Sequence, residues 1–296
     1  MHKLTDAEGA VGNADGWLNG ESLPADLSLI PDAVFTRLMS GDHIFGDDFV
    51  PTSIDRWFED EKSASYACYE GVDTTQYDAL NWIHAFRRVK HRKFENCLAI
   101  GVADGKDVEP LAHQVGRFFC VEPEEKWWRP IIGGKPAYYR APNANGSLNT
   151  FHDGFFDLSI AIGCLHHIPN VSHIISEMGR TTASGGYLIV REPVTMMGDW
   201  RFPRPNMTTR ERGLPPRPLL QAVKRAGFKP ESIVYFDCPL VARGGAKLGV
   251  KPFNSTAFVL LDWLLCRALR WNMHYRPRST LQKVAPSSVF IVARKV

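Results

Sequence analysis

The chain has 296 residues, of which 44% are hydrophobic and 23% charged, values that are ordinary for a globular protein with a real core. Its six cysteines are scattered, with no C-x-x-C pair and no ligand-like grouping with histidine, so we expect buried thiols in a reducing compartment and no metal. The N-terminus lacks the apolar core of a signal peptide, and we expect a cytoplasmic protein.

The net charge of +3 conceals an uneven distribution. Residues 1–190 hold 16 Lys and Arg against 26 Asp and Glu, whereas residues 191–296 hold 19 against 6, so that −10 and +13 sum to +3. A basic C-terminal third could attract an anionic substrate, nucleic acid or an anionic membrane surface. It could equally be a solvated face that complements the acidic N-terminal part.

The first 92 residues fall into two predicted segments. Residues 1–30 are rich in Gly, Asp, Asn and Ala with little periodicity, which predicts a flexible arm. Residues 31–92 follow with helical spacing of apolar side chains, such as Leu80, Ile83 and Phe86. We therefore predict a helical cap over 31–92, ahead of a main domain over 93–296.

The centre of the chain alternates strand-like and helix-like runs. The predicted strands are Asn96–Gly101, Arg117–Val121, Phe156–Ile162 and Gly186–Val190, with helices from about Lys106 and over Val171–Thr182. A helix over Leu219–Ala226 and strands over Ser232–Phe236 and Ser287–Ala293 follow. Such alternation predicts an α/β fold with a parallel sheet and helices on both faces.

A long connection, residues 237–286, separates the last two predicted strands and is expected to be a helical insertion. Its apolar run Thr256–Trp271 is interrupted by Asp262, Arg267 and Arg270. At about 16 residues it is shorter than the roughly 20 that a bilayer crossing needs, so we predict no transmembrane segment. A buried or interface helix, which could join two copies as a homodimer, is the preferred interpretation, and membrane-surface contact is the alternative.

The turn after the first central strand carries a candidate nucleotide site. Gly101 and Gly105 let the backbone bend sharply and pass close to a ligand. A dinucleotide fingerprint requires a small residue where Lys106 stands, so the spacing is of the G-x-G-x-G type instead. Glu122 ends the second strand, where its carboxylate could accept both hydroxyls of a ribose.

Further motifs follow at suitable distances. Phe156-Asp-Leu-Ser-Ile-Ala-Ile-Gly-Cys-Leu-His-His-Ile-Pro-Asn170 and Ser184-Gly-Gly-Tyr-Leu-Ile-Val-Arg-Glu192 complete a series that resembles the class I S-adenosylmethionine-dependent methyltransferases. The resemblance covers about residues 95–195 well and the C-terminal strands loosely. It implies a doubly wound, Rossmann-like sheet of seven strands, mostly parallel with an antiparallel last strand, and S-adenosylmethionine as cofactor.

The resemblance also implies roles for single residues. Gly101, Ala103 and Gly105 would form the wall against the methionine moiety, Glu122 would bind the ribose, Asn143 and Ala144 would contact adenine, and Gly163 and Leu165 would lie beneath the sulfonium. One departure is that Ala103 replaces a glycine. Another is that Ala99 stands where the family usually has an acid, so Asp104 could supply the missing carboxylate or the site could bind the cofactor weakly.

Two groups of residues are candidates for the acceptor side. His166 and His167 lie just past the predicted strand Phe156–Ile162, at the edge where open α/β sheets bind ligands. Either could act as a base for an amine or hydroxyl acceptor. Trp200, Arg201 and Arg204 follow the predicted strand Gly186–Val190 and could bind an anionic or sugar-like group. The alternatives are a histidine pair that only packs beneath the cofactor and a loop with solvated arginines.

We therefore predict a methyltransferase that acts on an O or N atom of a small acceptor. The alternatives are a noncatalytic S-adenosylmethionine-binding protein, which Ala99 would favour, and a nicotinamide-dependent oxidoreductase, against which Lys106 and the Leu-His-His turn count. Nucleic acid is not expected as a partner, because the sequence has no stacking-aromatic pattern or known RNA module. The identity of the acceptor is not encoded in the fold.

Overall fold

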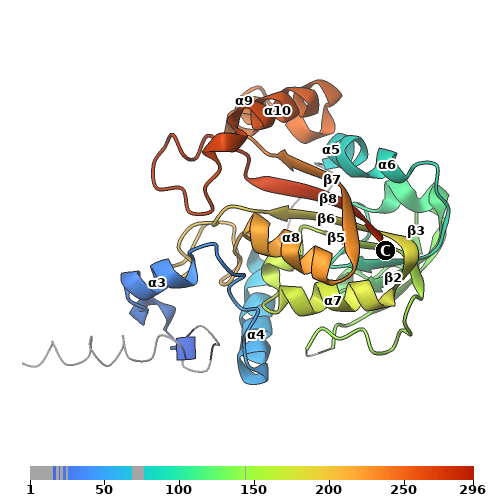
Figure 1. The fold of residues 1–296 in the computed structure, drawn as a ribbon, viewed down its shortest axis with the longest axis horizontal. Coiled ribbons are helices and arrows are strands. Elements are labelled where there is room, and N and C mark those ends of the chain that lie inside the picture. The colour runs from blue at the N-terminus through green and yellow to red at the C-terminus, as the bar shows by residue number, and fades with distance from the viewer. Residues whose placement is uncertain (1–15, 18–19, 21–22, 25, 69–76, 144) are drawn as a thin grey trace, which may run out of the picture.

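A single twisted sheet of eight strands organises the computed structural model (Figure 1). The structure describes residues 16–17, 20, 23–24, 26–68, 77–143 and 145–296, with the side chains of 62–68 left undescribed. The strands are β1 (Phe94–Ile100), β2 (Val115–Val121), β3 (Ile131–Ile132), β4 (Lys135–Arg140), β5 (Phe156–Ile162), β6 (Thr182–Pro193), β7 (Phe228–Phe236) and β8 (Ser288–Lys295). Their order in the sheet is β3-β4-β2-β1-β5-β6-β8-β7.

The pairing confirms a mostly parallel sheet whose last strand is antiparallel. Strands β4, β2, β1, β5 and β6 pair in parallel, while β8 runs antiparallel to both β6 and β7. The sheet has one strand more than predicted, because the two-residue β3 forms a hairpin with β4 across Gly133 and Gly134, which both have positive φ. Strand β4 was not predicted, since most of its residues are partly or fully exposed and give no apolar run.

The helices cover the two faces of the sheet. They are α3 (Asp32–Leu38), α4 (Pro51–Cys68), α5 (Asp78–Asn81), the π-helical η3 (Trp82–Phe86), α6 (Arg87–Val89), α7 (Val171–Thr181), α8 (Pro216–Arg225), α9 (Pro239–Lys247) and α10 (Thr256–Leu269). Short 3-10 turns are η1 (Leu27–Leu29), η4 (Glu109–Gln114), η5 (Glu125–Trp127), η6 (Leu165–His167), η7 (Pro252–Asn254) and η8 (Arg270–Asn272). In α7 the apolar side chains recur every three or four residues, and Ile174, Ile175 and Met178 bury that stripe against the sheet with residues of α8.

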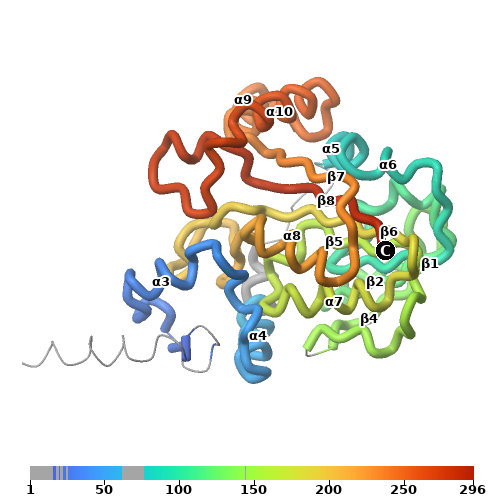
Figure 2. Tube along the Cα trace, viewed as in Figure 1, coloured from blue at the N-terminus to red at the C-terminus, as the bar shows by residue number. Residues whose placement is uncertain are grey.

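The packing divides the segment 31–92 that the sequence predicts as one cap. Leu80, Ile83 and Phe86, on α5 and η3, belong to the core of the sheet itself. Only the earlier part forms a separate cluster, in which Phe35 and Trp57 are fully buried. That cluster also takes in Trp17, Leu23 and Leu27 of the predicted flexible arm, so these residues pack, while residues 1–15 lie outside the described part. Figure 2 shows α3 and α4 beside the sheet domain.

The α-helix predicted from Lys106 is wrong. The segment between β1 and β2 holds turns followed by the six-residue 3-10 helix η4. Pro110, near the start of η4, has no N–H to donate to the carbonyl of Lys106, and it disfavours α-helical geometry in the residue before it. The glycine turn is therefore followed by further turns and a short 3-10 helix, and not by an α-helix with a full dipole.

The 237–286 insertion carries α9, η7, α10 and η8, which lie beyond the β7 edge of the sheet (Figure 1). Helices α9 and α10 share a small core of Cys238, Val241 and Cys266. Asp262, which interrupts the apolar run, is fully buried because its carboxylate accepts the backbone N–H groups of Asp237 and Cys238. Among the described helices, none has the length and hydropathy that a membrane crossing requires.

Candidate cofactor and acceptor site

A cavity of about 700 Å³ opens at the carboxyl ends of the parallel strands. Residues at the ends of β1, β2, β5 and β6 line it on one side, and Asp55, Phe58, Glu59 and Glu61 of α4 line it on the other. Open α/β sheets bind their ligands at this edge, where the strand order changes direction. The strand ends thus line one side of the cavity, and helix α4 lines the other.

Gly101 bends the chain sharply at the end of β1. Its φ of 60° lies in the left-handed region, and a Cβ at this position would stand 2.4 Å from Cβ of Cys164, which lies on the neighbouring turn. Ala103, also with positive φ at 45°, continues the turn and lines the cavity. Gly105 does not line it. A side chain there would meet Ile132 at 2.4 Å, so this glycine serves close packing.

Glu122 holds the glycine turn from the end of β2. One carboxylate oxygen, Oε2, accepts the Ala103 N–H at 2.9 Å, and the other accepts the Glu124 N–H at 3.2 Å. A carboxylate has about four acceptor sites, so two remain for the hydroxyls of a ribose. Burial raises the pKa of Glu122, while the two N–H donors oppose that effect. The geometry therefore fits the ribose-binding role that the sequence predicts.

The remaining predicted cofactor residues divide between the cavity and the core. Asp104, Asn143 and Gly163 line the cavity, and Gly163 has a φ of 63°. Leu165 is fully buried and is not among the lining residues of the described chain. Ala144 lies outside the described residues. The Leu165 side chain packs in the core beneath the turn, and its position beneath the sulfonium stays a prediction.

An arginine that the sequence analysis did not select lies beside Gly163. Arg191, near the end of β6, has its guanidinium 4.3 Å from the centre of the Tyr77 ring and donates to the side chain of Asn81 at 2.7 Å. It also pairs with Asp107 at 3.5 Å. Arg191, Tyr77 and Asp107 all line the cavity, so a buried cation and a partly buried carboxylate lie side by side in its lining.

Ala99 leaves no acid at the carboxyl end of β1, and its side chain belongs to the apolar core. Two carboxylates from the following turns line the cavity instead. Asp104, which the sequence suggested, pairs with Lys106 at 2.9 Å, and Asp107 pairs with Arg191 at 3.5 Å; both carboxylates are partly buried. Burial raises the pKa of Asp107, which Arg191 counteracts. Either carboxylate can accept an ammonium group, and Asp107 was missed because only the fold brings it to Arg191.

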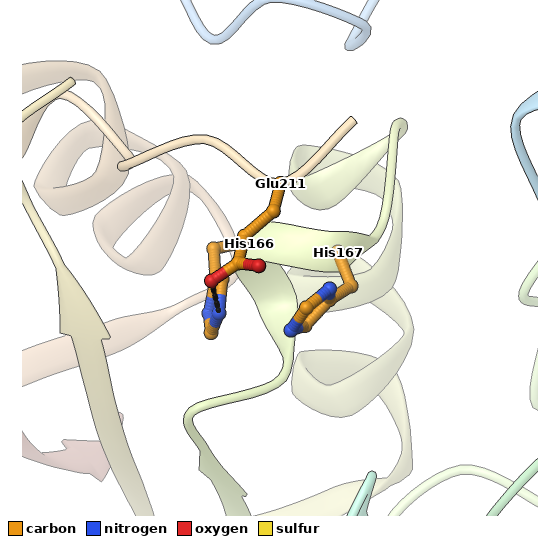
Figure 3. A group of neighbouring side chains, drawn as sticks. All are labelled: His166, His167 and Glu211. Atoms are coloured by element: carbon orange, nitrogen blue, oxygen red, sulfur yellow. Dashed lines mark ion pairs between the residues drawn. The ribbon is translucent and has the colours of Figure 1, made fainter. Parts of the chain in front are cut away.

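The two predicted histidines occupy different environments on η6 (Figure 3). His167 lines the cavity, and its Nδ1 lies 2.7 Å from Oε2 of Glu61 on α4. Thr208 donates to the same carboxylate oxygen at 2.6 Å. Although burial raises the pKa of Glu61, its bonds with His167, Thr208 and the Arg210 N–H hold that pKa below the ordinary value. Glu61 therefore fixes the His167 ring and keeps the proton on Nδ1.

His166 is enclosed by carboxylates and does not line the cavity. Its Nδ1 lies 2.7 Å from Glu192 at the end of β6, and its Nε2 lies 3.5 Å from Glu211. Glu192 also accepts the N–H groups of residues 164, 165 and 166, so it caps the whole turn. Burial lowers the pKa of His166, but the two carboxylates outweigh it and raise the pKa to about 9. His166 is thus a buried cation that shapes the turn.

Nitrogen and oxygen atoms of His166, His167 and Glu211 lie within 4.8 Å of one another, a grouping that could in principle hold a metal ion. A tetrahedral zinc site, with bonds of about 2.0–2.2 Å, would draw such atoms closer together. Each Nδ1 already bonds to a carboxylate, and Nε2 of His166 lies 3.5 Å from Glu211. The arrangement is accounted for as a hydrogen-bonded ion cluster.

Trp200, Arg201 and Arg204 do not line the cavity in the described part of the chain, so the structure corrects their predicted acceptor contact. Trp200 is 2% exposed and stacks on Phe45 with ring centres 4.9 Å apart. Arg201 bonds Asp199, Asp32 and the carbonyl of residue 30. Arg204 donates to the carbonyls of residues 197, 208, 209 and 211. These side chains tie the loop after β6 to itself and to the N-terminal cluster.

Comparison with known proteins agrees with this geometry. The family model described as a methyltransferase domain matches residues 98–190, which hold β1, the glycine turn, Glu122 and the Leu-His-His turn. Residues 98–190 of the chain thus match a methyltransferase domain. This match agrees with S-adenosylmethionine as the predicted cofactor and disagrees with the nicotinamide alternative. No curated protein sequence matches the chain.

Several solved structures are similar to the methyltransferase. An S-adenosylmethionine-dependent methyltransferase from Mesorhizobium loti is 15% identical, covers 69% of this chain and 92% of its own, and has a TM-score of 0.45. The [4+2]-cyclase SpnF is 15% identical over 83% of this chain and 97% of its own, with a TM-score of 0.49. The N-methyltransferase NodS from Bradyrhizobium japonicum, in complex with S-adenosylhomocysteine, is 12% identical over 89% and 97%, with a TM-score of 0.42.

Proposed function

We propose that this methyltransferase transfers a methyl group to the nitrogen of an amine or the oxygen of a hydroxyl on a small acceptor. His167 is the general base, and Glu61 orients it. The observation that supports the proposal is the 2.7 Å contact between Nδ1 of His167 and Glu61 at the wall of the cavity. Because that contact keeps the proton on Nδ1, the neutral ring carries its lone pair on Nε2. The ring can then take up the proton that an amine or hydroxyl loses.

The cofactor supplies a methyl group already activated by positive sulfur. The protein then has to position the two reactants and to accept one proton. In this proposal Glu122 accepts the ribose hydroxyls, and Arg191 and Asp107 bind the carboxylate and ammonium of the methionine moiety; their position in the cavity lining supports these roles. In this arrangement Gly101 and Gly163 keep the turns free of side chains, so the backbone can approach the cofactor closely.

The acceptor is expected to be hydroxylated or amine-bearing rather than anionic. Asp55, Glu59 and Glu61 of α4 line the cavity on the side of His167, whereas the arginines that suggested an anionic group lie elsewhere. Carboxylates accept hydrogen bonds from O–H and N–H groups and repel a negatively charged ligand. A sugar-like acceptor with free hydroxyls or an amino group remains compatible with this wall.

The test is methyl transfer from labelled S-adenosylmethionine to small molecules that carry a primary amine, a hydroxyl or a carboxylate as the only acceptor. We expect turnover with an amine or hydroxyl, and a loss of about 10²- to 10⁴-fold in kcat in His167→Asn. Binding of S-adenosylhomocysteine should stay at the wild-type level in that variant. His152→Asn, a change at an exposed histidine, is the matched control. Equal turnover by wild type and His167→Asn would refute the base, and exclusive transfer to carboxylates would refute the acceptor class.

A further inference from the structure

Helix α10 buries one face and leaves the opposite face open to solvent. Val259, Asp262 and Cys266 are its buried residues. The other side chains, taken at spacings of three and four residues, define a second face of Ala257, Leu260, Leu261, Leu264, Ala268 and, in η8, Trp271. A helix on the surface of a globular protein normally turns polar residues outward, so this helix reverses the expected pattern.

The outward face is strongly exposed. Leu264 is 56% exposed and Trp271 is 77% exposed, while Leu260 and Leu261 are nearly half exposed. Leu240 on α9 and the segment after it, with Leu248 and Val250, are exposed as well. Because α9 and α10 pack on each other around a shared core, these side chains belong to one unit of the structure (Figure 1). We call this unit the α9–α10 surface, meaning the exposed residues of 239–271. Several large apolar side chains gathered in this way mark an interaction site.

The charge within residues 238–286 is almost entirely basic, although exposed Asp78 of the neighbouring α5 donates its N–H to Asn254 of η7. Residues 238–286 contain eight Lys or Arg and one acid, Asp262. That acid is fully buried and bonded to backbone N–H groups, so it adds no negative charge to the outside. The basic side chains that are exposed on or between the helices are Arg243, Lys247, Lys251, Arg267 and Arg270. An apolar face with a predominantly basic border complements an anionic interface that has an apolar interior.

We propose that the α9–α10 surface docks on an anionic phospholipid bilayer, with the leucines and Trp271 in the interfacial region and the basic residues against the headgroups. Tryptophan is enriched at this depth because its ring is apolar and its N–H is polar. The alternative of a second copy is disfavoured, since a symmetric contact through this face would bring the two sets of arginines and lysines together. The docking would be peripheral, and it is independent of the acceptor and base proposed above.

The test is flotation of the full chain with vesicles of pure phosphatidylcholine and with vesicles that contain 30% phosphatidylglycerol. We expect the chain to float with the anionic vesicles at low salt and to bind less as the ionic strength rises. Leu260→Gln plus Leu264→Gln should reduce the binding by at least roughly tenfold. Arg267→Gln plus Arg270→Gln should reduce it by roughly fivefold for each charge removed.

Two matched variants control for unspecific effects. Leu29→Gln changes a leucine of comparable exposure on η1, and Lys224→Gln plus Arg225→Gln removes two exposed charges from α8. Both should float like the wild type, and all variants should bind S-adenosylhomocysteine equally, which shows that they are folded. Equal binding to neutral and anionic vesicles, or no binding at all, would overturn the proposal. A concentration-dependent dimer that only the leucine variant abolishes, without vesicle binding, would assign the surface to a second copy.

Discussion

Glu61 and His167 are 106 residues apart in the sequence, yet Oε2 of Glu61 lies 2.7 Å from Nδ1 of His167. The contact joins the N-terminal helix α4 to the turn after β5, and Thr208 from a third segment donates to the same oxygen. Trp57, one turn earlier on α4, donates its indole N–H to the carbonyl of His167 at 2.7 Å. Helix α4 therefore fixes both the backbone and the ring of this histidine.

The first prediction concerns the carboxylate of Glu61. Glu61→Gln keeps the shape and an acceptor oxygen but removes the charge that would stabilise a protonated His167. We expect kcat to fall by about 10- to 100-fold, the value of a charged hydrogen bond, with little change in cofactor affinity. Glu59→Gln, on the same helix and cavity wall, should leave kcat nearly unchanged. Steady-state kinetics of the two variants measures the difference, and an equal loss in both would assign the effect to general charge rather than to the contact.

The second prediction concerns Glu122 and the cofactor. Glu122→Gln weakens two backbone contacts and the expected ribose contacts, so the Kd for S-adenosylhomocysteine should rise by about 10- to 100-fold. Burial raises the pKa of Glu122, so wild-type affinity should begin to fall at a higher pH than an ordinary glutamate would allow. Calorimetric titration across pH 4–7 measures both effects. Glu125→Gln, at an exposed acid nearby, is the control, and a wild-type Kd in Glu122→Gln would remove this residue from the site.

A third prediction separates steric contact from backbone strain at the glycine turn. Gly101→Ala and Gly134→Ala both place a side chain at a positive φ, 60° and 79°, which costs about 1–2 kcal/mol in each case. Only Gly101→Ala also meets another residue, Cys164 at 2.4 Å, whereas nothing lies within 4 Å at Gly134. Gly101→Ala should therefore lower both the unfolding midpoint and the affinity for S-adenosylhomocysteine, and Gly134→Ala only the midpoint. Normal cofactor affinity in Gly101→Ala would contradict this assignment.

The fourth prediction tests the corrected role of Arg204. Its guanidinium donates to four carbonyls of the loop that carries Thr208 and Glu211. Arg204→Ala should lower the free energy of unfolding by roughly 1–3 kcal/mol, because buried carbonyls lose their donor. Arg217→Ala, at an exposed position, should have little effect in the same urea titration. A higher KM for the acceptor at unchanged stability would instead restore the acceptor-binding role that the sequence suggested.

The sequence was informative wherever a signal is local. Strands such as Phe156–Ile162 are continuous apolar runs, and the helix at Val171 has a regular apolar stripe, so both were found at nearly their observed bounds. The sequence indicates the glycine turn and Glu122 because both lie close together in the chain, within one strand-turn-strand segment whose residue spacing is visible locally. Strand β4 was missed because its side chains are mostly exposed, and the helix at Lys106 was wrong because Pro110 limits the turn to 3-10 geometry.

The acceptor side depended on contacts that no local pattern contains. Glu61 lies in a helix whose position follows from the packing of Trp57 and its neighbours, so nothing near residue 61 indicated a partner for His167. Arg201 and Arg204 lie in a proline-rich loop, and the sequence is compatible with solvated or ligand-binding side chains. In the structure Arg201 donates to a carboxylate and Arg204 donates to backbone carbonyls. Basic residues near a site are therefore ambiguous until their internal partners are known.

The last prediction uses the buried pair of His166 and Glu192 as a pH-dependent stabiliser. The pKa of His166 is raised from 6.5 to about 9, so the folded state holds a proton that the unfolded chain releases at lower pH. Its contribution is complete below pH 6.5 and is lost as the pH rises to about 9, a decline on the order of 3 kcal/mol. Urea unfolding between pH 6 and 9.5 measures that decline. His166→Gln should be less stable at pH 6 and should flatten the slope, whereas His113→Gln, at an exposed histidine, should keep it. A slope that persists in His166→Gln would place the titrating group elsewhere.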